Sequence, residues 1–89
     1  MVHQSHPDIV KRLKRAEGHL RKTISMIEED RPCVDVAQQL HAVEKAIGQA
    51  KKVFIHDHVD NCLEQSFDKG GGGGGREAIV EFKQISKYL

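Results

Sequence analysis

The stretch that decides the fold is residues 32–62, PCVDVAQQLHAVEKAIGQAKKVFIHDHVDNC. Its apolar side chains recur at every third or fourth position, namely Val36, Leu40, Val43, Ile47, Ala50 and Phe54. That spacing is typical of an amphipathic helix, and Pro32 suits a helix start. We therefore predict one long helix over about 33–64, roughly 45 Å in length. Two short neighbours in the same chain do not cover a helix of that length, so the pattern also predicts a partner subunit.

A shorter helix is predicted on each side of the long one. The first covers about 7–29, with apolar positions Ile9, Leu13, Ala16, Leu20, Ile24 and Ile27. A glycine tract at 70–75 precedes the third, which covers about 76–89 with apolar positions Ile79, Phe82, Ile85 and Leu89. No stretch alternates as a strand would. Residues 1–89 are therefore predicted to form a single all-α domain, a three-helix protomer with a long central helix.

Size and composition restrict the class of protein. The chain has 89 residues, 38% hydrophobic and 4% aromatic, with 14 basic against 13 acidic side chains. So short a chain often needs oligomerisation or a metal ion for stability. No apolar stretch is long enough to span a bilayer, and the N-terminus lacks the features of a signal peptide. Two cysteines in such a chain favour free thiols in a reducing compartment. We expect a cytoplasmic protein without a membrane partner.

His58 and Cys62 lie four residues apart, so on a helix they share one face. Imidazole and thiolate are the ligand types that select zinc, copper or nickel. The only other cysteine, Cys33, lies 25 residues before His58, roughly 37 Å along a continuous helix. One ion is within reach of all three side chains only if a second copy of the long helix lies antiparallel to the first. The alternative is packing, because a lone cysteine in a helix is more often a small buried apolar residue than a ligand.

Basic residues are concentrated in the first helix: Lys11, Arg12, Lys14, Arg15, Arg21 and Lys22. Between residues 8 and 22 only Asp8 and Glu17 oppose them. Such a stripe neutralises DNA phosphates and gives salt-dependent affinity, and Lys51 and Lys52 on the long helix extend it. Because the net charge is only +1, a solvated charged face explains the pattern equally well.

These segments together resemble the CsoR/RcnR family of metal-sensing transcriptional repressors. The resemblance rests on RLKRAEGHL at 12–20, Cys33, QQLHAVEKA at 38–46 and the pair His58-x3-Cys62. It implies an antiparallel homodimer that pairs into a disc-shaped homotetramer. It also implies binding to double-stranded operator DNA in the metal-free state and release on binding the effector, which derepresses metal efflux or detoxification genes.

The resemblance implies as metal ligands Cys33, His58 and Cys62. Copper sensors of the family use this set for trigonal Cu(I), whereas nickel and cobalt sensors add a histidine near the N-terminus. His3 is the first candidate for that ligand and His6 the second, and their presence favours Ni(II) or Co(II) over Cu(I). A carboxylate of the third helix, Glu77 or Glu81, is expected to support the ligands. His19 stands where the family commonly has glutamine.

Other functions share some of these residues. A repressor of the same family that senses formaldehyde or persulfide would use the thiols of Cys33 and Cys62 without needing His58. A cytosolic metal carrier would use the same metal site without the basic stripe. An enzyme ranks far last, because the sequence offers neither an oxyanion-hole motif nor a third catalytic group.

Overall fold

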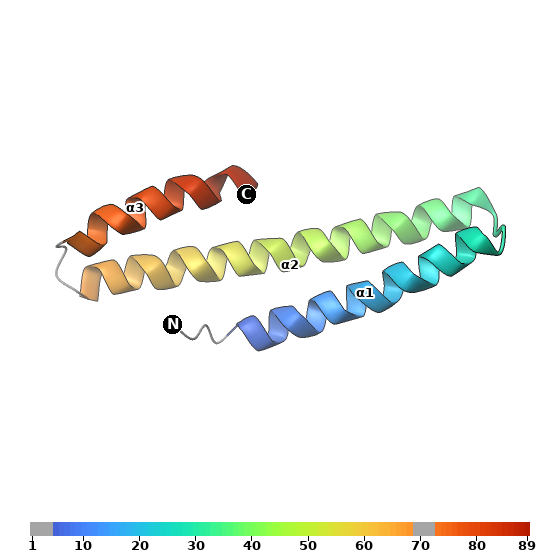
Figure 1. Ribbon diagram of the computed structural model, residues 1–89, viewed down its shortest axis with the longest axis horizontal. Coiled ribbons are helices and arrows are strands. Elements are labelled where there is room, and N and C mark those ends of the chain that lie inside the picture. The colour runs from blue at the N-terminus through green and yellow to red at the C-terminus, as the bar shows by residue number, and fades with distance from the viewer. Residues whose placement is uncertain (1–4, 69–72) are drawn as a thin grey trace.

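The computed structural model describes the backbone of residues 5–68 and 73–89, and the side chains of 5–60, 77 and 79–89. Nearly all of this part is helical, which confirms the predicted all-α fold with a long central helix (Figure 1). The elements are α1 (His6–Glu28), α2 (Cys33–Asp68), α3 (Gly73–Ile85) and the 3-10 helix η1 (Ser86–Tyr88). None of the described helices is both long enough and apolar enough to cross a membrane.

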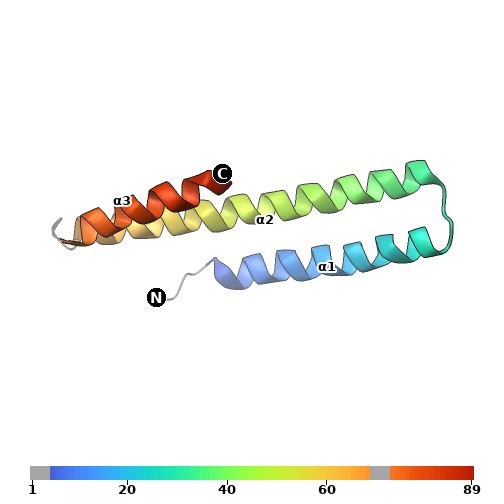
Figure 2. The same ribbon diagram turned by 45° about the horizontal axis from the view of Figure 1, so that its top comes forward.

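The central helix α2 supports both of its neighbours. Helix α1 runs back along the N-terminal part of α2, and α3 runs back along its C-terminal part (Figures 1 and 2). In the described ranges α1 and α3 each pack on α2 and not on each other. The molecule is therefore elongated, with extents of 59 × 23 × 13 Å. The two ends of α2 have different neighbours, so functional groups placed near them are far apart within one chain.

The turn between α1 and α2 is a Schellman motif. Arg31 N donates to Met26 O at 3.0 Å, and Asp30 N donates to Ile27 O at 3.1 Å. Asp30 adopts φ 54°, the left-handed conformation that this motif requires and that Asp tolerates better than most residues. Pro32 O then accepts Val36 N at 3.1 Å, which starts α2. This tight reversal places Cys33 at the first position of α2.

Helix ends differ from the predicted ranges by a few residues. The first helix begins at His6 and ends at Glu28, one residue before each predicted bound. Helix α2 continues to Asp68 beyond the predicted 64. Helix α3 begins at Gly73, inside the glycine tract. The sequence did not predict this start, because glycine has no side chain that could contribute to a hydrophobic pattern. The last residues tighten into η1, as helix ends often do.

The core of one chain is thin. Among the described side chains, the buried ones are Ile9, Ala16, Thr23 and Met26 on α1 and Val43, Ala50 and Ile55 on α2. Larger apolar side chains stay exposed in two rows with a spacing of seven residues, Leu13, Leu20 and Ile27 on α1 and Leu40, Ile47 and Phe54 on α2. Seven-residue spacing of exposed apolar side chains is the pattern by which helices of different subunits pack together.

Candidate metal centre and nucleic-acid interface

His58 lies where α3 crosses the C-terminal part of α2, and Glu81 approaches it from α3. Nε2 of His58 donates to Oε1 of Glu81 at 2.7 Å. The His58 side chain is 21% exposed and that of Glu81 51% exposed, so the pair lies at the edge of the α2–α3 contact. A histidine that donates from Nε2 to a carboxylate has its lone pair on Nδ1 in the neutral form. This arrangement is the usual one for a metal-binding imidazole, and the residues present therefore fit a transition metal.

Glu77, the other predicted supporting carboxylate, is exposed one turn earlier on α3. It borders a shallow depression of about 440 Å³ together with Val80, Glu81 and Gln84. Of the two carboxylates, only Glu81 has a hydrogen bond to a predicted ligand among the described contacts. Sequence spacing alone had left this choice open.

Cys33 lies at the opposite end of α2 from His58. Its thiol is free and exposed, and it borders a groove of about 310 Å³ between the end of α1 and the start of α2. The other residues lining this groove are Ile27, Asp30, Arg31, Val36, Ala37 and Leu40. Within the described part of one chain, no group of three His, Cys, Asp or Glu side chains is close enough to hold an ion. Among the described residues, a single chain therefore does not bring Cys33 and His58 together.

Two predicted ligands lie outside the described residues. The Cys62 position falls within α2, but its side chain is not described, and His3 is not described at all. His6 is described as the first residue of α1, where its ring stacks on Phe54 with centroids 5.3 Å apart and planes inclined by 15°. Phe54 precedes His58 by four residues on α2, so His6 lies about one helical turn from His58 along that helix.

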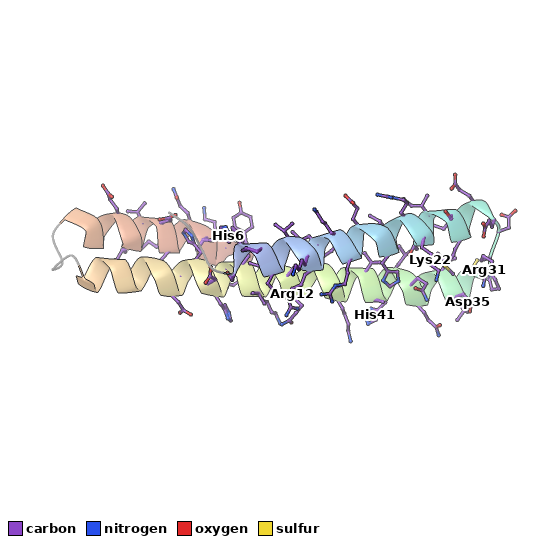
Figure 3. The ribbon with its side chains drawn as sticks, turned by 90° about the horizontal axis from the view of Figure 1, so that it is seen from below. His6, Arg12, Lys22, Arg31, Asp35 and His41 are labelled. Carbon is purple, nitrogen blue, oxygen red and sulfur yellow. The ribbon has the colours of Figure 1, made fainter. Side chains whose placement is uncertain are left out.

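All eight predicted DNA-binding residues are exposed. On α1, helical geometry gathers Lys11, Lys14, Arg15, Arg21 and Lys22 on one face, separate from the face that carries the exposed leucines. Figure 3 labels two of the basic side chains of α1, Arg12 nearer its start and Lys22 nearer its end. Lys51 and Lys52 follow on α2. These exposed side chains supply the positive charge that phosphate contacts need.

Two acidic side chains form ion pairs with basic residues of α1. Arg12 Nε donates to Asp8 Oδ2 at 2.9 Å, and Arg21 donates to Glu17 at 3.4 Å. The hydrogen bond from Arg12 holds the pKa of Asp8 below its ordinary value of 3.8, and the charges of Arg12, Arg15 and Lys11 add to the effect. Asp8 is therefore an anion at neutral pH and competes with phosphate for Arg12. The four-residue spacing of Asp8 and Arg12 was the sequence signal for this pair.

A groove between α1 and α2 adjoins the basic surface, and we call it the basic groove. It has a volume of about 270 Å³ and is lined by Arg12, Arg15, Ala16, His19, Ala46 and Gln49. His19 is half-buried, and its Nε2 lies 2.5 Å from Oε1 of Gln39 on α2. Sequence reasoning gave no functional role to His19, Gln39 or Gln49, because nothing in the spacing of α1 shows which α2 residues face it.

Comparisons with known proteins identify what this arrangement is similar to. A sequence model described as "Metal-sensitive transcriptional repressor" matches residues 5–87. The copper-sensing transcriptional repressor CsoR of Mycobacterium ulcerans (strain Agy99) is 36% identical over 78 residues, which are 88% of this chain and 67% of that protein.

Two solved structures share the fold. The nickel-responsive transcriptional regulator InrS superposes with a TM-score of 0.82 at 29% identity, over 100% of this chain and 98% of that one. The copper-sensing repressor CsoR with Cu(I) from Geobacillus thermodenitrificans NG80-2 gives a TM-score of 0.72 at 30% identity, over 97% and 91% of the two chains.

Proposed function

This chain belongs to the family of metal-sensitive transcriptional repressors, and from that premise we propose that it binds one transition-metal ion between two subunits. The proposed ligands are Cys33 of one chain and His58 and Cys62 of the other. Separation of Cys33 and His58 at the two ends of α2 supports this assignment, because one chain cannot place both on one ion. An antiparallel pair of α2 helices would bring the two ends together and form two equivalent sites.

The observation that carries the proposal is the hydrogen bond between His58 and Glu81. This 2.7 Å contact orients the imidazole, and a neutral ring that donates from Nε2 has its lone pair on Nδ1. The carboxylate also makes the ring a stronger electron donor toward a cation. A carboxylate partner of this kind is the usual support of a metal-binding imidazole, so the pair favours a ligand role.

The exposed apolar rows of α1 and α2 support the subunit contact. Leu40 and Ile47 are each 45% exposed although they lie on the same helix as buried Val43 and Ala50. A second copy of the chain would remove these side chains from water, at about 25 cal/mol for each Å² of apolar surface buried. We propose a homodimer, and a homotetramer built from two such dimers.

The proposed effector is Ni(II) or Co(II), with Cu(I) as the alternative. Proteins similar to this chain are named as copper-sensing and nickel-responsive, so the fold accommodates either response. A Cys-His-Cys set suits Cu(I), and an additional imidazole suits Ni(II). His6 lies near His58 along α2 and is the described N-terminal histidine that supports Ni(II) or Co(II).

The proposed partner is double-stranded operator DNA, which the basic surface would contact in the metal-free state. Metal regulates this contact only if it binds the DNA-incompetent form more tightly, because a ligand shifts an equilibrium through differential affinity alone. We propose that ligands from two subunits meet this condition by fixing Cys33 against the opposite end of a second α2, and with it the spacing of the basic surfaces. The expected consequence is release of DNA and expression of metal efflux or detoxification genes.

The test is operator binding followed by fluorescence anisotropy, with a duplex selected from a random-sequence pool. We expect Ni(II), Co(II) or Cu(I) to weaken binding, and Cys33→Ala to bind the same duplex without responding to metal. His41→Gln is the matched control, because His41 is an exposed α2 histidine outside the proposed ligand set. Affinity that no metal changes would exclude the metal-sensing mechanism.

A thiol sensor is the second candidate, and the exposed thiol of Cys33 favours it. Such a sensor would respond to persulfide or formaldehyde and would not need His58. Mass spectrometry after persulfide treatment, compared between the natural chain and His58→Ala, separates the two. A response to persulfide that survives His58→Ala, with no response to metal, would assign the thiol function.

A further inference from the structure

The basic groove contains a histidine that the proposed metal site does not use. His19 lines the groove together with Arg12 and Arg15, whereas the α2 wall contributes only the uncharged Ala46 and Gln49. Two guanidinium groups and an imidazole around a groove of about 270 Å³ form a donor set suited to a phosphate oxyanion. The groove adjoins the basic surface of α1, so a backbone phosphate of bound DNA is the oxyanion that it would meet.

The contact with Gln39 determines which nitrogen of His19 carries a proton. Oε1 of Gln39 is an acceptor only, so Nε2 of His19 must be the donor across their 2.5 Å separation. In neutral His19 the remaining nitrogen, Nδ1, is therefore an acceptor and opposes a phosphate oxygen. In protonated His19 the same Nδ1 carries N–H and attracts the phosphate. One proton on Nδ1 therefore changes the contact with phosphate from repulsive to attractive.

The charged groups near His19 are few. On α1 they are Arg15, one turn before it, and Lys22, nearly one turn after it. Arg12 lines the same groove and is paired with Asp8 at 2.9 Å. On α2 the neighbouring charge is the half-buried Asp35, one turn before Gln39. Figure 3 shows Lys22 and Asp35 toward the same end of the α1–α2 pair. In the described ranges α3 does not pack against α1, so it adds no charge here.

We propose that His19 is a further DNA-contacting residue, which binds a backbone phosphate in the basic groove only when protonated and makes operator affinity rise as pH falls. The inference rests on the proposed DNA-binding function and adds a second input to it. Histidine is the side chain whose charge changes between about pH 5 and pH 8, so that is the range in which the test is made. Metal and proton would then act at separate places, at the ends of α2 and at the middle of α1.

The experiment measures affinity of the metal-free protein for the selected operator duplex at constant ionic strength between about pH 8 and pH 6. One charge-assisted phosphate contact corresponds to an operator affinity about tenfold higher at the lower pH in the natural chain. His19→Gln keeps a hydrogen-bonding group opposite Gln39 but cannot take up the charge, and should not show this increase. His41→Gln removes one exposed histidine from α2 and should keep it.

Two further measurements separate a phosphate contact from a structural role. At the lower pH, the slope of log affinity against log salt should be smaller by about one in His19→Gln, because the variant neutralises one phosphate fewer. Calorimetric titration in buffers of different ionisation enthalpy should show proton uptake on DNA binding by the natural chain and less uptake by the variant. His19→Arg should bind tightly at both pH values, and circular dichroism should show unchanged helix content in all variants.

An unchanged pH response and unchanged proton uptake in His19→Gln would overturn this inference while leaving metal-regulated DNA binding intact. Failure of the proposed function would instead appear as operator affinity that no metal changes.

Discussion

Replacement of Glu81 by glutamine tests the centre of the metal-site proposal with the smallest possible change. The amide keeps an oxygen that accepts from Nε2 of His58, but it removes the negative charge 2.7 Å from that nitrogen. A hydrogen bond to a charged group contributes about 1.5–3 kcal/mol. Because the Glu81 side chain is 51% exposed, solvent reduces this contribution, and we expect about 1.4 kcal/mol, which is a tenfold loss of metal affinity.

The measurement is competition for metal against a chromophoric chelator, with Ni(II) and Cu(I) in separate titrations. Glu77→Gln is the matched control, since it makes the same chemical change one turn earlier on α3, at an exposed position. The control should bind metal as the natural chain does, and both variants should bind operator DNA equally well without metal. Equal metal affinity of Glu81→Gln and the natural chain would refute the supporting role of Glu81.

Two other substitutions test the basic surface and the core. Asp8→Asn should raise operator affinity of the metal-free protein in an anisotropy titration, because it releases Arg12 from a 2.9 Å ion pair. Because the pKa of Asp8 is lowered in the folded chain, the small stabilising effect of its charge is present above pH 3.8 and is lost as pH falls through the folded pKa. The melting temperature of Asp8→Asn should therefore fall less on acidification than that of the natural chain. Ile55→Ala should lower the free energy of unfolding by about 2–5 kcal/mol, because Ile55 is 2% exposed. A denaturation midpoint unchanged by Ile55→Ala would contradict the observed core.

Among the proposals, the proton-dependent role of His19 depends on tertiary structure most completely. His19 and Gln39 are 20 residues apart, and only the reversal at Asp30 brings them into contact. The same reversal places Arg12 and Arg15 beside Gln49. A sequence shows the basic residues of a helix but not the neutral residues that form the opposite wall of a groove.

The sequence by itself determined that the chain is α-helical with a long central helix, because the apolar repeat from Val36 to Phe54 matches the period of an α-helix. It also determined the separation of Cys33 from His58, since a continuous helix has a fixed rise per residue. It did not determine the start of α3 at Gly73, because glycine contributes nothing to a hydrophobic pattern.

Tertiary structure alone decided which face of each helix is buried and which groups meet across helices. Leu13 and Ala16 both follow the apolar repeat of α1, yet Leu13 is 43% exposed and Ala16 only 5%. Likewise Glu81, rather than Glu77, meets His58. The physical reason is that periodicity fixes directions around one helix axis, whereas the rotation and sliding of a second helix depend on packing between side chains distant in the chain.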